Sequence, residues 1–148
     1  MMSIRDAAKF VRMAHKKMRL GEFSREPVRL LRIEWKTDTL ECDWLMRDSD
    51  PWDKDLPPQL AKENQTLQAL RDALTLRDSI FRLFPEVVKA ELRMFRVDGL
   101  DSLELMMTGS VDRANLVPER VASITMRARL SGFQFNLSAG VLEGRPQS

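Results

Sequence analysis

An alternation of apolar and polar side chains runs through residues 31–46, on both sides of Thr37-Asp38. This alternation is typical of a β-strand that buries one face, and two alternating runs joined by two residues predict a hairpin. A two-residue turn also sets the register, because each residue then has a defined partner on the other strand. On the apolar face, this register pairs Trp35 with Leu40, Ile33 with Cys42, and Leu31 with Trp44.

The polar face of the same hairpin carries charged side chains. The register places Arg32 opposite Asp43, which is a favourable cross-strand pair. It also places Glu34 opposite Glu41, which is unfavourable unless a cation lies near them. We expect Lys36 to supply that cation.

A second hairpin is predicted around Asp98-Gly99, which is flanked by alternating residues. Asp-Gly between two such runs is a strong short-range hairpin signal. As a two-residue turn it pairs Met94 with Leu103 on the apolar face. On the other face it predicts an ion pair between Arg93 and Glu104.

A third hairpin is predicted around Ser131-Gly132. Pro118 and Glu119 suit the start of a helix, so residues 118–130 could form either a helix or a strand. The strict alternation from Ala122 to Leu130 favours the strand.

Two other segments repeat apolar residues every three or four positions, as amphipathic helices do. The first begins near Ser3, which suits a helix N-cap, and stops before Gly21. The second begins at Pro57 or Pro58 and ends before Pro85, because proline is tolerated in the first turn of a helix but not in its interior. Its predicted apolar face consists of Leu60, Leu67, Leu70, Ala73, Leu74, Ile80, Phe81 and Phe84.

These segments predict an α+β fold with the order α-β-β-α-β-β-β-β. An antiparallel sheet of about six strands, built from three hairpins, would have both helices on its apolar face. The chain has 148 residues, of which 43% are hydrophobic and 31% charged, which suits one globular domain. We expect that domain to cover residues 1–143 and residues 144–148 to form a flexible tail.

The chain is expected to be cytoplasmic. It has a single cysteine, Cys42, so no disulfide within the chain calls for an oxidising compartment. Its first twenty residues carry a charge every few positions and lack the apolar run of a signal peptide. No stretch approaches the roughly 18 apolar residues of a membrane span.

Charge is unevenly distributed, although the net charge is only +2. Residues 1–36 hold ten Lys or Arg against four Asp or Glu, and residues 37–64 hold three against eight. The first helix would carry basic residues on one face, called here the basic face: Arg5, Lys9, Arg12, Lys16 and Arg19. The simplest interpretation is a solvated helix surface; the functional one is a contact with an acidic partner.

The polar side of the third predicted hairpin is a second candidate contact surface. It would consist of Thr125, Arg127, Arg129, Gln134, Asn136 and Ser138, with Arg127 and Arg129 as its cations. An ordinary solvent-facing sheet surface explains the same residues.

Catalytic and metal-binding candidates are few. His15, the single histidine, lies beside two lysines, and Cys42 lies between two acids and is predicted to be an inert core residue. A cluster of carboxylates in one loop is a weak candidate site for a hard cation: Asp48, Asp50, Asp53 and Asp55. The loop lacks the glycine and the final glutamate of an EF-hand, and the chain contains no phosphate-binding glycine motif, so no cofactor is expected.

The functional hypothesis from sequence is therefore a non-catalytic interaction module that binds an acidic protein partner. Non-specific nucleic-acid binding is an alternative function, although a protein partner is favoured over nucleic acid. Sequence-specific reading of a single strand is disfavoured, because no aromatic residues interleave with the basic face. The alternative is a small enzyme or ligand-binding protein with a site near the acidic loop and Trp52. A homo-oligomer formed through an unpaired sheet edge is a further hypothesis, and a long exposed edge strand would be its structural sign.

Overall fold

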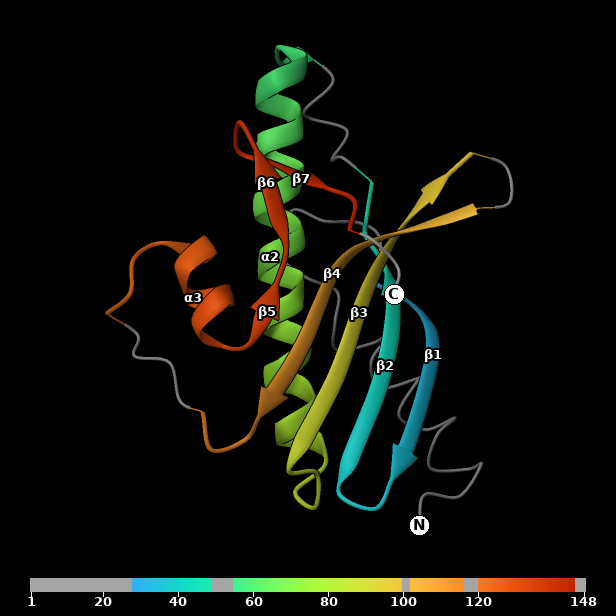
Figure 1. The fold of residues 1–148 in the computed structure, drawn as a ribbon. Helices are drawn as coiled ribbons and strands as arrows, with labels where there is room; N and C mark the ends of the chain where they lie inside the picture. Colours follow the sequence, from blue (N-terminus) through green and yellow to red (C-terminus); the bar gives the residue numbers. More distant parts are fainter. Residues whose placement is uncertain (1–27, 49–54, 100–101, 116–119, 146–148) are drawn as a thin grey trace.

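The computed structural model describes residues 28–48, 55–99, 102–115 and 120–145. It has an α+β fold in which a five-stranded mixed sheet packs one face against a long helix (Figure 1). The predicted first helix lies outside the described residues. Along the chain the elements are β1 (Arg29–Lys36), β2 (Thr39–Leu45), α2 (Pro58–Leu83), β3 (Lys89–Asp98), β4 (Ser102–Asp112), α3 (Ile124–Leu130), β5 (Phe133–Gln134), β6 (Asn136–Ser138) and β7 (Val141–Glu143).

The first predicted hairpin is confirmed as β1 and β2, joined at Thr37-Asp38. Trp35 lies opposite Leu40 and Ile33 opposite Cys42, as the two-residue turn requires. Beyond Arg32, towards the start of β1, the predicted register is wrong by one residue. A β-bulge between Leu30 and Arg32 brings Leu30 opposite Trp44, and Leu31, which was expected in the core, has 44% of its surface exposed.

The predicted all-antiparallel sheet is wrong, because β2 and β3 pair in parallel. The sheet order is β1-β2-β3-β4-β5, so β2 and β3 are neighbours connected through α2. A helix between two strands returns the chain to the end where the first strand began, and the second strand then runs in the same direction as the first. The predicted boundaries of this helix are confirmed, since Pro58 is its first residue and it ends at Leu83, before Pro85.

The second hairpin is confirmed as β3 and β4, but its register differs from the prediction. Asp98 pairs with Ser102, so the connection is longer than Asp98-Gly99 alone. Together with a bulge between Met94 and Phe95, this places Met94 opposite Met107 instead of Leu103.

The ion pair predicted between Arg93 and Glu104 is wrong for the same reason. With the register displaced, Arg96 lies opposite Glu104, and its Nη2 donates to the Glu104 carboxylate. Arg93 pairs instead with a carboxylate on β2.

The third predicted hairpin is also wrong, because α3 forms where a strand was expected. The Ser123 side chain caps this helix by accepting a hydrogen bond from the Met126 backbone N–H. The alternation had placed Met126 and Leu130 in the core, but 56% and 51% of their surfaces are exposed. Ser131-Gly132 therefore joins a helix to β5, which extends the main sheet beside β4, while β6 and β7 form a separate small sheet.

The core lies between α2 and one face of the main sheet. Leu70, Ala73 and Ile80 of α2 are fully buried, whereas Leu60, which was expected on the same face, is 42% exposed near the start of the helix. Each fully buried large apolar side chain contributes about 1.5–3 kcal/mol. The strand residues in this core with no more than 1% exposure are Leu40, Cys42, Trp44, Ala90, Leu92, Met94, Met106, Met107 and Val111.

A buried ion pair holds α2 to the segment that leaves β2. Arg47 donates from Nε and Nη2 to the two carboxylate oxygens of Asp72, at 2.7 and 2.8 Å, and both side chains are almost fully buried. The Gln65 side chain also donates to the backbone oxygen of Arg47, at 3.1 Å. These bonds fix the start of the crossover against the middle of the helix.

The C-terminal part of the described chain packs beside α2 (Figure 1). The Leu142 backbone N–H donates to Thr66 Oγ1 at 3.0 Å, and Ala128 of α3 belongs to the core. Arg145, within the predicted tail, donates its backbone N–H to Leu105 at 2.6 Å. In the described segments, no helix is long and apolar enough to cross a bilayer.

We predict that Asp72→Asn lowers the free energy of unfolding by about 3 kcal/mol, because it removes the carboxylate charge that faces the buried Arg47 guanidinium. Urea unfolding followed by circular dichroism measures this change. Asp78→Asn is the matched control, since Asp78 lies on the same helix with an exposed side chain. Equal effects of the two substitutions would contradict the assigned role of the buried pair.

Candidate functional site

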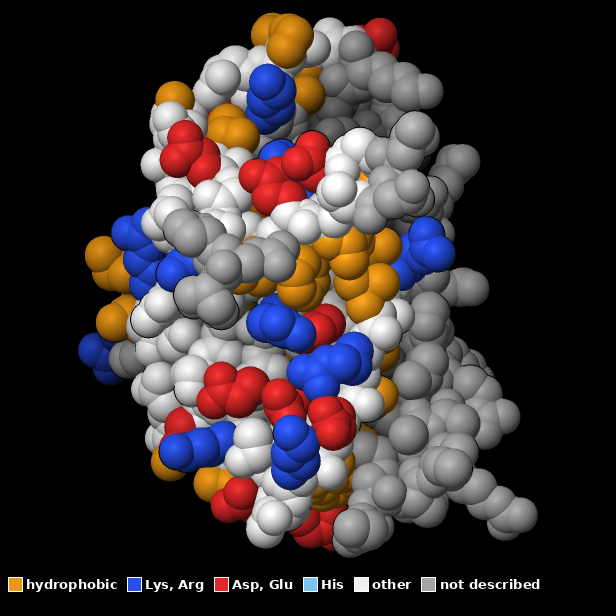
Figure 2. Space-filling model, turned by 45° about the vertical axis from the view of Figure 1, so that its right-hand side comes forward, with side chains coloured by type: hydrophobic (Ala, Val, Ile, Leu, Met, Phe, Trp, Pro, Cys, Tyr) orange, Lys and Arg blue, Asp and Glu red, His pale blue; other side chains and the backbone are white. Residues whose placement is uncertain are grey.

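A shallow groove of about 420 Å³ lies on the open face of the main sheet, opposite the face covered by α2. Figure 2 shows positive and negative side chains interleaved over this face. The groove crosses all five strands of the sheet. Its lining consists of Arg32, Glu41, Glu91, Leu92, Arg93, Thr108, Gly109, Ser110, Gly132 and Gln134.

Asp43 forms the base of the charged part of this face. It lies directly opposite Arg32 on β1 and Arg93 on β3, so the three residues form a row across adjacent strands. Arg93 donates from Nε and Nη2 to Asp43, at 3.0 and 2.6 Å, and Arg32 Nε donates to Asp43 Oδ2 at 3.2 Å. The predicted pair of Arg32 with Asp43 is thus confirmed, and the parallel pairing of β2 with β3 adds the second arginine.

The two facing glutamates of the first hairpin are neutralised as predicted. Glu34 lies opposite Glu41, and Lys36 Nζ is 3.1 Å from Glu41 Oε2. Arg32 Nη1 also donates to Glu34, at 2.6 Å. The hydrogen bond from Lys36 lowers the pKa of Glu41, and Arg32 lowers it further, so this carboxylate stays charged at neutral pH.

The opposite side of the groove presents uncharged hydrogen-bonding groups. Thr108 on β4 lies opposite Gln134 on β5, and neither side chain has a hydrogen-bond partner within the described part of the chain. Ser110 Oγ donates to Glu91 Oε1 at 2.8 Å, and both residues line the groove. This side therefore offers both donors and acceptors to a bound molecule.

A glycine permits the close approach of β5 to β4 at this side of the groove. Gly132 has a φ of +109°, which side chains rarely adopt, and a Cβ there would lie 2.4 Å from the backbone oxygen of Ser110. The backbone oxygen of Gly132 accepts the Ser110 N–H at 3.2 Å. Any larger residue at position 132 would displace the strand that carries Gln134.

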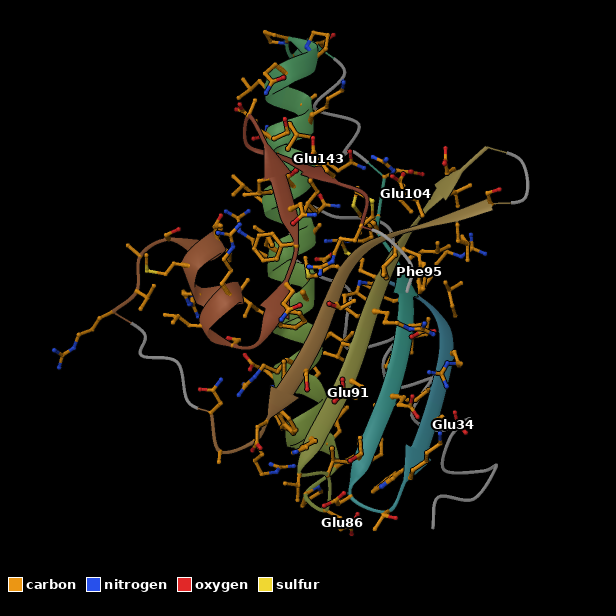
Figure 3. All side chains as sticks on the ribbon, in the orientation of Figure 1. Glu34, Glu86, Glu91, Phe95, Glu104 and Glu143 are labelled. Atoms are coloured by element: carbon orange, nitrogen blue, oxygen red, sulfur yellow. The ribbon has the colours of Figure 1, made fainter. Side chains whose placement is uncertain are left out.

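Phe95 continues the row formed by Glu91 and Arg93 along β3 and provides an apolar end to the charged face (Figure 3). The Arg93 guanidinium carbon is 5.3 Å from the centre of the Phe95 ring, a cation–π distance. Its hydrogen bonds to Asp43 raise the pKa of Arg93, so this side chain is held in place and stays charged. The arginine is thus positioned by a carboxylate and by an aromatic ring.

The contact surface predicted on the last hairpin does not exist as one sheet face. Thr125, Arg127 and Arg129 lie on α3, Gln134 lies on β5, and the remaining two residues lie on β6. Arg129 stacks over Phe135, with 4.8 Å between its guanidinium carbon and the ring centre. Of the predicted set, Gln134 alone lines the groove.

The other predicted candidates divide between described and undescribed residues. Cys42 is fully buried, and burial with the nearby Asp43 raises its pKa to about 12, which confirms a core cysteine. Asp48 and Asp55 are exposed, and the described residues contain no group of three His, Cys, Asp or Glu side chains that could hold a metal ion. Outside the described residues lie His15, Asp50, Trp52, Asp53 and the basic face of Arg5, Lys9, Arg12, Lys16 and Arg19.

Comparisons with protein families, with curated proteins and with solved structures found no match for this chain. The site is therefore defined by its own geometry. Sequence reasoning identified the side built by Arg32 and Asp43, but it missed the side built by Glu91, Thr108 and Ser110. The alternation of β3 and β4 places these residues on the open face, but only the order of the strands shows that they adjoin Asp43.

We predict that Lys36→Met raises the pKa of Glu41, because the substitution removes the hydrogen bond that most lowers it. A carboxylate whose folded pKa lies below its ordinary value contributes stability above that value, and the contribution is lost as the pH falls through the folded pKa. An NMR pH titration of the Glu41 carboxylate measures the change, with the exposed Glu86 as an internal control. A decrease in the pKa of Glu41, or no change, would contradict this arrangement of charges.

Proposed function

We propose that this protein is a non-catalytic interaction module that binds a polypeptide partner across the open face of its main sheet. The observation that carries this proposal is the groove, in which fixed charges of both signs lie beside the Thr108 hydroxyl and the Gln134 amide, whose side chains have no hydrogen-bond partner among the described residues. A polypeptide surface offers the same mixture of charges, donors and acceptors. The charges, donors and acceptors of the groove could therefore each meet a complementary group on a polypeptide.

The charge of the groove favours a polypeptide over a nucleic acid. Arg32 and Arg93 are balanced by Glu41 and Glu91, and Asp43 beneath them adds a further negative charge. Binding of a phosphate backbone depends on a surplus of Lys and Arg. Without such a surplus in the groove, the partner is selected by the pattern of charges rather than by the net charge.

The titration of the groove favours binding over catalysis. General acid–base catalysis works best with a group whose pKa lies near the working pH. In this groove the pKa of Glu41 is lowered and that of Arg93 is raised, which moves both groups away from neutrality. The ion pairs therefore act as fixed contact points.

Two predictions from sequence stand beside this proposal. The contact of an acidic protein with the basic face remains a prediction, and so does a ligand site near the acidic loop. A partner protein that binds the groove and also carries acidic residues would fit both this proposal and the predicted contact with the basic face. Of these three candidate surfaces, the proposal rests on the groove, because all the residues that line the groove are described.

We predict that a photo-crosslinking amino acid at Thr108, in the full-length protein, forms a covalent product with one specific partner protein in cell extract. Thr108 belongs to the lining of the groove, so a polypeptide bound there would lie within reach of its side chain. Mass spectrometry identifies the product. The same amino acid at Arg71, an exposed position on α2, is the control; identical products from both positions, or none from Thr108, would contradict the proposal.

Once a partner is identified, affinity measurements with purified proteins separate the groove from the rest of the surface. Arg93→Ala is expected to weaken binding about tenfold or more, because it removes a charge of the groove lining that Asp43 holds in place. Arg71→Ala is expected to leave the affinity unchanged. Equal affinities of the two variants would exclude the groove as the binding surface.

A further inference from the structure

We infer that β1 is a self-association edge at which a second copy of this chain adds its own β1 in antiparallel orientation, with Ile33 opposite Ile33. β1 is the end strand of the sheet order, and among the described residues no strand pairs with its outer side. It is eight residues long, and a long edge strand readily pairs with another chain. The inference does not depend on the proposed function of the groove.

The backbone of β1 is oriented for this pairing. In a hairpin with a two-residue turn, the residues that flank the turn exchange hydrogen bonds, so Lys36 bonds to Thr39 and Glu34 to Glu41. The N–H and C=O groups of Ile33 and Trp35 then point away from β2. An antiparallel pair centred on Ile33 uses these groups, because Ile33 bonds to its own copy.

The same register is self-complementary in charge. A pair centred on Ile33 places Arg32 of one copy opposite Glu34 of the other, and the two-fold symmetry repeats this contact. Within one chain these two side chains already lie on the same face, 2.6 Å apart. Pairing would therefore bring together two Arg32 and two Glu34 side chains, with opposite charges facing each other across the junction. A shift of the register by one residue would turn the side chains of one copy to the other face of the sheet.

Exposed apolar surface supports the same register. Leu31 is 44% exposed at the β-bulge, and the register brings it opposite Trp35 of the second copy. The bulge lies at the Leu30 end of the strand, so residues 32–36 keep regular edge geometry. The two open faces would become one continuous sheet surface, with Glu34 of each copy beside the groove of the other.

The first test is the mass of the full-length protein by sedimentation velocity from about 1 µM to about 1 mM, the range in which small interfaces dissociate. The protein is expected to convert from monomer to dimer with concentration. Glu34→Lys is expected to weaken the dimer about tenfold, since it places two like-charged pairs at the junction. Glu86→Lys, an equal charge change at an exposed turn, is expected to leave it unchanged.

The register is tested by cysteine crosslinking, which the native Cys42 does not disturb because it is fully buried. Ile33→Cys brings two thiols together across a pair whose Cα atoms are about 5.5 Å apart, within the range of a disulfide. Lys36→Cys is the control, because in this register its copies lie about 20 Å apart. A monomer at every concentration, or equal crosslinking of the two variants, would overturn the inference.

Discussion

The parallel pairing of β2 with β3 is the constraint on which both faces of the sheet depend. It brings Asp43 opposite Arg93, so that one carboxylate joins charged residues from three strands. On the other face it aligns Leu40 and Trp44 with the strand that α2 covers. This pairing requires the crossover to be held in place, and the buried pair of Arg47 with Asp72 fastens its beginning to the helix.

The elements that could be predicted from sequence are those fixed by local chemistry. The two-residue turn at Thr37-Asp38 determined the register of the first hairpin as far as Arg32, and prolines determined both ends of α2. The parallel pairing of β2 with β3 was missed, although the predicted helix between them suits a parallel crossover, because no local pattern shows that these two strands are neighbours in the sheet. In residues 118–130 the strict alternation favoured a strand over a helix, but residues 124–130 form a helix that is capped by Ser123.

The candidate site shows the same division. Arg32, Glu41 and Lys36 followed from the hairpin register, and their contacts are those expected from opposite charges on one face. Glu91, Thr108 and Gln134 join them only through the order of the five strands, which no local pattern specifies. The register of β4 against β3 also depended on a bulge that the alternation of residues does not reveal. A surface built from several strands is thus harder to predict than any of its strands.

The most direct test of this account is a double-mutant cycle between Asp43 and Arg93, measured by the free energy of unfolding of Asp43→Asn, Arg93→Gln and the double variant. If β2 and β3 pair in parallel with these residues opposite each other, removal of either charge loses the same contact, and we expect a coupling energy of about 1–2 kcal/mol. Additive effects would mean that the two residues do not interact, and would contradict both the register and the groove that it builds.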